Sequence, residues 1–384
     1  LEAPLAPFTG TEKVHTFNIG ESFDLDIALA MLKRLVDREK LGPSTQAIVD
    51  EAQKRGIPWF RLDKQSLIQL GTGRYRKTIR ASITSDTSSI AVETASDKDL
   101  TKKLLAAAGI PVPKGDVVRT VEGAVEAASE IGYPVTVKPL DGNHGSGITT
   151  YLNEPDEVRG AFAKAKLHSS AVIVEKHYTG RDYRVLVVKG EVVAVAHRVP
   201  AQVRGNGADT IETLINTVNA DPRRGNGHEN FLTHIKIDEA LIEWLTRAGL
   251  TLQTIPARNQ RITLAPTANL STGGTATDCT DKIHPDNASI ARRAAQIIGL
   301  DVAGIDMILP NISRSWRETG GGIIEVNASP GLRMHLQPTI GKPRNVAKNI
   351  VSAMFPSGAK TQVPVVAITG TNGKSTTVRM IVHI

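Results

Sequence analysis

Apolar side chains recur along the chain at two spacings, and each spacing predicts a different kind of element. Positions three and four residues apart, the spacing of a helix that buries one face, mark residues 24–40, 45–54, 97–108, 121–131, 154–166, 210–219, 238–248, 285–298 and 344–354. Short alternating or wholly apolar runs, typical of strands, mark residues 58–62, 67–70, 78–83, 116–119, 134–139, 148–151, 171–175, 183–188, 191–198, 303–309, 322–327 and 364–368. The pattern therefore predicts a chain in which helices and strands are mixed throughout.

Two glycine-containing segments lie between predicted strands. Asp141–Gly147 separates the strands 134–139 and 148–151, which predicts a flap of two strands and a flexible loop. Gly71-Thr72-Gly73 separates two other strands. Its glycines also invite comparison with a phosphate-binding loop, but the spacing alone is a weak signal and a hairpin turn explains it more simply.

Composition narrows the class of protein. The chain has 384 residues, enough for two or three domains, and it is 40% hydrophobic and 22% charged, as ordinary globular proteins are. The single cysteine, Cys279, excludes a disulfide scaffold, and no apolar run approaches the roughly 20 residues of a membrane-spanning helix. We therefore expect a cytoplasmic protein with no membrane partner. Because the chain starts at Leu1 and stops at Ile384 within a predicted helix, we treat it as a piece of something longer.

Charge favours a small anionic ligand over a nucleic acid. The chain carries 46 Lys and Arg against 39 Asp and Glu, a net charge of +7. The basic residues are spread along the sequence and aromatic residues make up only 4%, so no base-stacking surface is predicted. A nucleotide fits this charge equally well, and we expect no nucleic-acid partner.

Three oxygen-bearing side chains lie on two predicted strands. Asp306 lies in the apolar run 303–309, and Glu325 and Asn327 alternate along 322–327, so these two point to one face of a sheet. Carboxylates on buried strands are costly to desolvate unless a cation compensates them, and carboxylate and amide oxygens suit Mg²⁺. A hydrogen-bonded cluster or a solvated sheet face accounts for the pattern equally well, so the pattern alone leaves the metal open.

Cationic side chains stand beside the predicted flap. Lys138 ends the strand before it, where its ammonium group would meet phosphate oxygens beneath the backbone N–H groups of the loop. Lys98 lies in the first turn of its helix, where a cation gains nothing from the helix dipole, so either a bound anion or solvent explains it. The strand end Glu175-Lys176, followed by Asp182, offers groups that an adenosine would use.

Taken in this order, the features resemble the ATP-grasp ligases. The resemblance implies an α+β fold in which two α+β subdomains sandwich ATP, with Mg²⁺ as cofactor and a carboxylate activated as an acyl phosphate. It implies phosphate binding by Lys98 and Lys138, a flap of Gly142, Asn143, His144, Gly145, Ser146 and Gly147, an adenine hinge of Glu175 and Lys176, ribose binding by Asp182, and metal binding by Asp306, Glu325 and Asn327.

A second phosphate-loop pattern lies near the C-terminus. It follows the predicted strand 364–368 and opens a helix at Ser375. Ile368 stands where the general P-loop has its first glycine, and the shorter form resembles that of the Mur ligases, which also make amides through acyl phosphates. The resemblance implies a second ATP site formed by Gly370, Thr371, Asn372, Gly373, Lys374, Ser375 and Thr376.

An ATP-grasp region followed by a Mur-type loop resembles the cyanophycin synthetase family. The resemblance extends over nearly the whole chain from about residue 40, and its motifs are Leu41–Thr45, Ser66–Gly71, Ala91–Glu93, Asn219–Gly225, Thr267–Ala276 and Asn327–His335. It implies an N-terminal accessory domain over 1–90, an ATP-grasp domain over 91–355, a linker over 356–363 and the start of a Mur-like domain over 364–384. It also implies a homo-oligomer, a tetramer in that family.

The same resemblance implies two reactions. The ATP-grasp site would phosphorylate the C-terminal carboxylate of a poly-aspartate primer for attack by aspartate, and the Mur-like site would activate the new β-carboxylate for attack by arginine. Aspartate, arginine and a cyanophycin primer are therefore the expected substrates. Two other interpretations stay open: another ATP-grasp peptide ligase, either glutathione-synthetase-like or using an aspartyl-arginine dipeptide, and a non-catalytic nucleotide-binding scaffold.

Residues on the acceptor side are predicted from chemistry and from the resemblance. Arg261 and Arg333 are candidates for gripping carboxylates, because guanidinium groups pair with them bidentately, although surface ion pairs explain either arginine as well. D-alanine–D-alanine ligases carry an arginine where this chain has Gly304, so that substrate is disfavoured and another arginine must supply the charge. The predicted catalytic residues are Arg261, Arg333 and Asn269, and the predicted substrate-binding residues are Ser271, Thr272, Gly273, Gly274 and His335.

Overall fold

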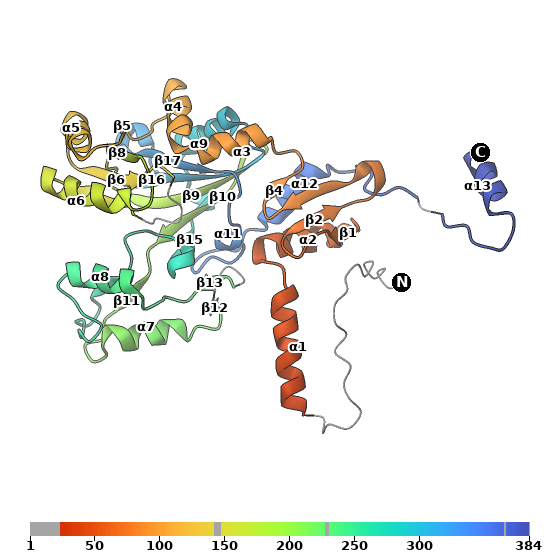
Figure 1. The fold of residues 1–384 in the computed structure, drawn as a ribbon, viewed down its shortest axis with the longest axis horizontal. Helices are drawn as coiled ribbons and strands as arrows, with labels where there is room; N and C mark the ends of the chain where they lie inside the picture. The colour runs from red at the N-terminus through yellow and green to blue at the C-terminus, as the bar shows by residue number, and fades with distance from the viewer. Residues whose placement is uncertain (1–23, 142–146, 227–229, 365, 384) are drawn as a thin grey trace.

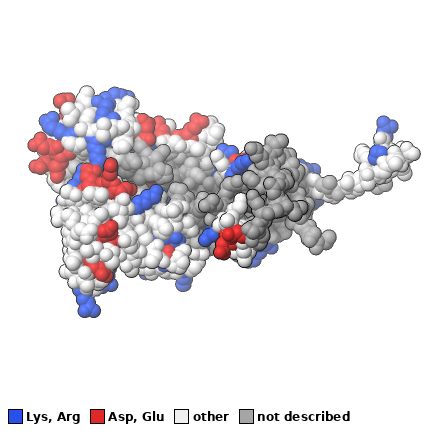
Figure 2. All heavy atoms as spheres, turned by 60° about the horizontal axis from the view of Figure 1, so that its bottom comes forward, with Lys and Arg blue, Asp and Glu red and all other residues white. Residues whose placement is uncertain are grey.

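The computed structural model describes residues 24–141, 147–226, 230–364 and 366–383. The structure comprises an N-terminal region, a small lobe, a large lobe with an inserted subdomain and a C-terminal helix (Figure 1). On the face shown in Figure 2, basic and acidic side chains are interspersed. None of the helices in these ranges has the length and apolar character needed to cross a membrane.

The N-terminal region is a four-stranded antiparallel sheet that follows two helices. Its elements are α1 (Leu25–Glu39), α2 (Pro43–Lys54), β1 (Trp59–Arg61), β2 (Leu67–Leu70), η1 (Gly73–Tyr75), β3 (Lys77–Arg80) and β4 (Ile83–Thr84). Ile68, Leu70 and Ile79 are buried in a core shared with α12 (Val346–Met354). The hairpin predicted at Gly71–Gly73 is confirmed, because β2 and β3 pair antiparallel on either side of this turn.

The small lobe is an antiparallel sheet with the strand order β5–β8–β6–β7, and two helices pack against it (Figure 1). Its elements are β5 (Gly115–Val118), α5 (Val121–Ile131), β6 (Val135–Pro139), β7 (Thr149–Leu152), α6 (Pro155–Lys166) and β8 (Val172–Lys176). Alternate valines of β6 and β8 are fully buried against the helices, as the apolar runs predict. The two flap strands are β6 and β7, which pair as expected. The flap residues 142–146 lie outside the described residues.

The large lobe is built on a five-stranded antiparallel sheet with the order β15–β10–β9–β16–β17. Its elements, with the helices around it, are α3 (Ser89–Ser96), α4 (Lys98–Ala107), β9 (Arg181–Val188), β10 (Glu191–Val199), η2 (Leu270–Thr272), β15 (Thr275–Asp278), η3 (Thr280–Lys282), α9 (Pro285–Ile298), β16 (Val302–Leu309), α10 (Trp316–Thr319), β17 (Gly322–Asn327) and α11 (Arg333–Leu336). Helices α3, α4 and α9 contribute side chains to the core on one face of the sheet. The predicted pairing of 303–309 with 322–327 is confirmed by β16 and β17.

An inserted subdomain with its own core lies between β10 and β15. Its elements are β11 (Gln202–Arg204), α7 (Ile211–Asn219), β12 (Arg224–Gly225), β13 (Leu232–Thr233), α8 (Glu239–Arg247) and β14 (Arg261–Thr263). Ile211 and Ile215 of α7 pack in one cluster with Leu241 and Leu245 of α8, at helical spacings of four residues. This subdomain stands beside the large-lobe sheet (Figure 1).

The C-terminal part differs from the sequence prediction in one element. The helix expected from Ser375 is present as α13 (Lys374–Val382), but the expected strand over 364–368 is wrong for the residues described there, which form no strand. Val366 is 70% exposed. An apolar run becomes a strand only when neighbouring strands accept its backbone hydrogen bonds, and these residues do not pair with any described strand.

Candidate active site

A cleft with a volume of about 840 Å³ is lined by strands of both lobes. Lys138 of β6 and Glu175 of β8 line it from the small lobe. Asp182 of β9 and Arg198 of β10 line it from the large lobe. Most of the titratable groups predicted to handle a nucleotide therefore reach a single cavity.

A buried charge cluster joins two strands of the small lobe to helix α4 of the large lobe. Lys138 Nζ donates to Glu175 Oε1 at 2.7 Å, and Lys102 Nζ donates to Glu175 Oε2. Burial lowers the pKa of Lys138 to about 8, and burial followed by the charge of Lys138 lowers the pKa of Lys102 well below its usual range. Two lysines share one carboxylate here, so they have only one anion between them, and phosphate oxygens would supply a second.

Lys102 is absent from the residues predicted by sequence. It lies four residues after Lys98 on α4, a spacing that puts both side chains on one face of the helix. The sequence could have indicated Lys102 through this spacing, because the helix that carries both lysines was predicted over 97–108. Only the packing of α4 beside β17 and the approach of Glu175 place Lys102 in the site.

A second buried network on the large-lobe sheet is centred on Asp306. Arg184 donates to both carboxylate oxygens, through Nε to Oδ1 and through Nη2 to Oδ2 at 2.9 Å. Arg198 Nη2 donates to Asp306 Oδ2 at 2.9 Å, and its Nε donates to Asp182 Oδ1 at 2.7 Å. The strand register explains these contacts, because Arg184 is opposite Asp306 and Arg198 is opposite Asp182.

The two carboxyl groups of this network respond differently to burial. Burial alone would raise the pKa of Asp306, but Arg184 and Arg198 more than offset it, so the pKa lies below its ordinary value. Burial raises the pKa of Asp182 to about 6 in spite of Arg198. Asp306 is therefore an anion throughout the neutral range, whereas Asp182 titrates just below it.

The guanidinium of Arg184 occupies the space that Gly304 leaves open. A Cβ atom at Gly304 would lie 3.1 Å from Arg184 Cδ and 2.7 Å from Pro330 Cβ. Arg184 comes from the neighbouring strand β9. It thus lies beside Gly304, the position at which D-alanine–D-alanine ligases carry an arginine of their own. Neither Arg184 nor Arg198 was predicted as a site residue, because spacing along a strand does not distinguish a buried arginine from one on an exposed face.

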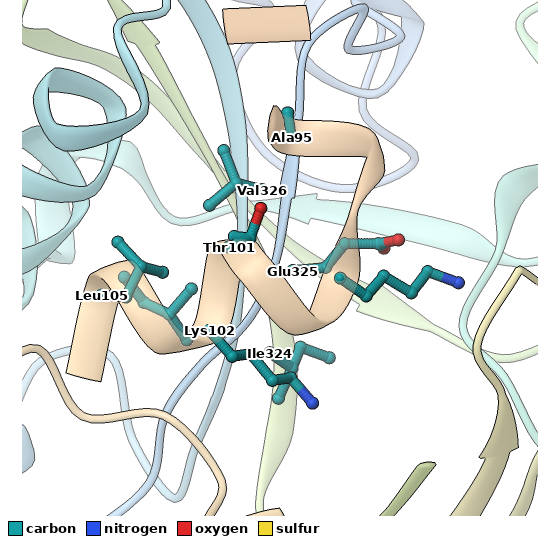
Figure 3. A pocket seen from close by; sticks show the side chains of 9 residues that line it. Ala95, Thr101, Lys102, Leu105, Ile324, Glu325 and Val326 are labelled. Carbon is teal, nitrogen blue, oxygen red and sulfur yellow. The ribbon is translucent and has the colours of Figure 1, made fainter. Parts of the chain in front are cut away.

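The three predicted metal ligands lie on one face of β16 and β17. Asp306 is opposite Glu325, and Gly304 is opposite Asn327, whose Nδ2 donates to Gly304 O at 3.3 Å. Glu325 and Asn327 line a cavity of about 310 Å³ together with Lys98. Glu325 also lines a smaller pocket beneath α4, where Figure 3 shows it beside the helix that carries Thr101 and Lys102.

The donor set suits magnesium in its chemistry, because all three groups offer hard oxygens. Asp306 is 2% exposed and uses both oxygens on arginines, whereas Glu325 and Asn327 open to the cavity. Within the described ranges, no three or more His, Cys, Asp and Glu side chains form a group that could hold a metal ion. A magnesium ion at Glu325 and Asn327 would therefore need oxygens from a nucleotide as well.

The other predicted nucleotide residues lie around the same cleft. Lys176 lines it, and its Nζ donates to the carbonyl oxygens of Gly132 and Tyr133 at 3.0 and 2.8 Å. Gly147, the described glycine of the flap, has φ +72°, and a Cβ atom there would lie 2.6 Å from His168 Cδ2. A side chain at this position would push against the small lobe.

The predicted acceptor residues are divided between the cleft and the interior. Arg261 lines the cleft. Arg333 is buried and donates to Asn230 O at 3.0 Å and to Thr233 Oγ1 at 3.2 Å. His335 is 2% exposed, and burial lowers its pKa to about 3. The structure thus brings Arg261 to the site and places the other two where they support the surrounding chain.

The predicted substrate loop lies beside the cleft. Ser271 and Thr272 line a cavity of about 370 Å³, which shares Pro266 and Thr267 with the main cleft. Glycine is required at two positions of this loop because neighbouring atoms leave no room for a side chain. A Cβ atom at Gly273 would lie 2.5 Å from Ile235 Cγ1, and one at Gly274 would lie 2.6 Å from Asn269 O. These residues are close enough to the cleft to contact an acceptor that extends out of it.

The predicted second ATP loop is exposed, and the segment that carries it extends away from both lobes (Figure 1). Lys374 Nζ donates to the carbonyl oxygens of Gly370 and Thr371, the latter at 3.2 Å. The ammonium group of Lys374 is therefore hydrogen-bonded within its own loop. Helix α13 begins directly after Gly373.

Comparison with known proteins agrees with this geometry. The family described as RimK-like ATP-grasp domain matches residues 95–213 and 263–354. The chain belongs to the RimK-like ATP-grasp family. Its α+β architecture is the ATP-grasp fold expected from the sequence, and the matched stretches hold both sheets of the cleft. The unmatched residues 214–262 fall within the inserted subdomain of this ATP-grasp chain.

Several relatives of this ATP-grasp chain are similar over most of its length. Cyanophycin synthetase of Trichormus variabilis is 50% identical over 362 residues, covering 94% of this chain and 40% of that protein. Cyanophycin synthetase of Synechocystis sp. is 46% identical over 364 residues, covering 94% and 42%. Glutathione biosynthesis bifunctional protein GshAB of Desulfotalea psychrophila is 35% identical over 327 residues, covering 83% and 41%.

A solved structure also resembles this ATP-grasp chain. The bifunctional glutathione synthetase from Pasteurella multocida aligns with a TM-score of 0.63 at 30% identity, over 86% of this chain and 46% of that chain. In all these comparisons the chain spans less than half the length of the relative that it matches.

Proposed function

We propose that this chain is the ATP-grasp part of an ATP-dependent ligase that activates a carboxylate as an acyl phosphate and joins it to an amine. The observation that carries the proposal is a pair of buried charge networks that both reach one cleft. Lys138 and Glu175 of the first network, which also includes Lys102, line the cleft. Arg198 lines it for the second network, which also includes Arg184 and Asp306. Phosphoryl transfer needs charge neutralisation and alignment more than covalent help, and these networks supply both.

In this proposal ATP lies between the two sheets. Lys98, Lys102 and Lys138 bind its phosphates, beneath a flap that includes Gly147. The strand end at Glu175 and Lys176 meets the adenine, and Asp182 binds the ribose. The burial of Lys138 supports the first role, because a desolvated ammonium group interacts more strongly with phosphate than an exposed one.

Glu325 and Asn327, which open to the cavity, would hold magnesium together with oxygens of the nucleotide, whereas Asp306, the third predicted ligand, lies across the strand pair with both carboxylate oxygens on arginines. When bound, magnesium would neutralise the charge that develops on the transferred phosphoryl group. Arg184 and Arg198 keep Asp306 ionised and in place, and Arg261 on the cleft wall would orient the acceptor carboxylate. The carboxylate oxygen then attacks the γ-phosphorus with ADP leaving, and an amine attacks the acyl carbon with phosphate leaving.

The acceptor proposed here is the C-terminal carboxylate of a poly-aspartate primer, and aspartate is the amine. Similarity to two cyanophycin synthetases over 94% of the chain supports this choice. The Mur-like loop with Lys374 would serve arginine addition, together with chain beyond residues 364–384. A cytoplasmic location and a homotetrameric state accompany this proposal as predictions.

A glutathione-type ligase is the second candidate, favoured by the similarity to GshAB and to the bifunctional glutathione synthetase. A panel of amino acids and primers, scored by phosphate release from the enzyme that contains this chain, separates the two. We expect release that depends on aspartate and a cyanophycin primer. Release with glycine and a small thiol dipeptide would favour the second candidate.

The same assay tests the metal ligands. Glu325→Gln should abolish aspartate-dependent release, because it removes a charged oxygen ligand that faces the cavity. Glu318→Gln is the matched control, since Glu318 lies on the exposed surface of α10, in a surface ion pair with Arg314. Wild-type activity in Glu325→Gln would show that the metal assignment is wrong.

A further inference from the structure

The turn between β2 and β3 contacts the segment that leads to the C-terminal loop. Thr72 N donates to Thr361 O at 2.9 Å, and Val363 N donates to Thr72 Oγ1 at 3.1 Å. Thr72 therefore uses its backbone donor and its side-chain acceptor on two residues of the same segment.

The glycines on either side of Thr72 are required by this contact. A Cβ atom at Gly71 would lie 2.6 Å from Thr361 O, and one at Gly73 would lie 2.7 and 2.8 Å from the two methyl groups of Val363. Both glycines also have positive φ, +75° and +58°. The turn thus fits residues 361–363 on both sides of its central threonine.

The turn is held firmly to the body of the molecule. Ile68 and Leu70 of β2 and Ile79 of β3 are at most 1% exposed and share a core with Leu186 and Val188. These last two belong to β9, the strand that also carries Arg184 and Asp182. The position of the turn is therefore fixed relative to the ATP-grasp cleft.

We propose that the turn Gly71–Gly73 is a docking seat for residues 361–363, which fixes the point where the phosphate-loop segment leaves the body. Pro364 follows at once, and its locked φ restricts the exit direction. The N-terminal region thereby fixes, relative to the first ATP site, where the chain that leads to the second phosphate loop leaves the body of the molecule. This role goes beyond the ligase function proposed above and does not depend on its substrates.

Amide hydrogen exchange on the chain tests the seat without any substrate. Thr72→Val keeps the shape of the side chain but removes the acceptor for Val363 N, whereas Thr72→Ser keeps a hydroxyl. We expect the Val363 amide to exchange about fivefold faster in Thr72→Val, the effect of one lost hydrogen bond, and at close to the wild-type rate in Thr72→Ser. Unchanged protection of the β2 and β3 amides shows that the variant is folded.

Proteolysis gives an independent measurement. Lys360 is exposed and directly precedes the docked residues, so trypsin should cut after it faster when they leave the seat. Gly73→Ala should raise this rate severalfold. Gly56→Ala is the matched control, because Gly56 has φ +69° but nothing within 4 Å of its Cβ position, so it carries the backbone strain without the collision.

The outcomes separate the seat from general destabilisation. Faster cutting in Gly73→Ala than in Gly56→Ala, with faster Val363 exchange in Thr72→Val only, supports the proposal. Equal cutting in both glycine variants, or Val363 exchange that is the same in wild type and Thr72→Val, overturns it. Neither measurement involves ATP, so failure here leaves the ligase proposal unaffected.

Discussion

Removal of Arg184 tests the network that holds Asp306. In Arg184→Met the carboxylate loses two charge-assisted hydrogen bonds and keeps the one from Arg198 Nη2. Both side chains are buried, with 10% and 3% of the side-chain surface exposed. Breaking one partner of such a pair leaves a poorly compensated buried charge, so we expect a loss of about 3–5 kcal/mol in the free energy of unfolding.

The assay is urea unfolding of single and double variants at pH 7. If the cost is electrostatic, adding Asp306→Leu to Arg184→Met should recover about 2 kcal/mol relative to the sum of the two single changes. Arg159→Met is the control, because Arg159 and Asp156 form an exposed ion pair at 3.7 Å, and its effect should stay within about 0.5 kcal/mol. Additive single effects would refute the assigned role of the pair.

Three further predictions concern single titratable residues. ATP binding at pH 8 should take up protons, because phosphate raises the lowered pKa values of Lys138 and Lys102, and calorimetry in two buffers should show a smaller uptake in Lys138→Met. Lys102→Met should weaken ATP binding about tenfold, whereas Lys103→Met, on the exposed side of the same helix, should leave it unchanged; equal effects would contradict the site. Because the pKa of Asp182 is raised from 3.8 to about 6, the folded chain binds more protons than the unfolded chain between these values. Asp182 should therefore reduce stability as pH rises from 4 to 6, and Asp182→Asn should flatten that slope in pH-dependent urea unfolding.

Local patterns were sufficient to predict most of the architecture. The paired strands β16 and β17, the flap strands β6 and β7, and the hairpin at Gly71 all follow from apolar spacing and glycine positions. The strand expected at 364–368 was wrong because an apolar run does not specify whether a partner strand is present. Pairing of neighbours is a tertiary property, and local spacing carries no information on it.

The site was predictable where a residue's role depends on its own strand. The common face of Glu325 and Asn327 follows from alternation, and the cleft position of Lys138 follows from the end of β6. Arg184 and Lys102 could not be assigned in the same way, because their roles depend on the elements opposite them, β16 and β8. For the same reason Arg333 was predicted to grip a carboxylate of the acceptor, although its guanidinium donates to Asn230 and Thr233 in the interior.

Arg261 and the glycines at 273 and 274 lie near the cleft, but the shape of the acceptor region around them was not predictable. Their positions beside the cleft agree with the predicted acceptor region, but the inserted subdomain supplies part of the surrounding wall, including Ile235. The sequence gives no signal for how this subdomain packs against the loop. The wall of the acceptor region is therefore known only from the fold.

If the cleft activates a carboxylate as an acyl phosphate, an oxygen of that carboxylate must end in the released phosphate, and oxygen labelling measures this transfer. A cyanophycin primer with ¹⁸O in its C-terminal carboxylate is turned over with ATP and aspartate by the enzyme that contains this chain, and the released phosphate is analysed by ³¹P NMR. We expect one labelled oxygen in the phosphate released by the first addition to each primer, since later additions use the unlabelled carboxylate of the new aspartate. Unlabelled phosphate from that first addition, or label found in AMP, would show that no acyl phosphate forms there.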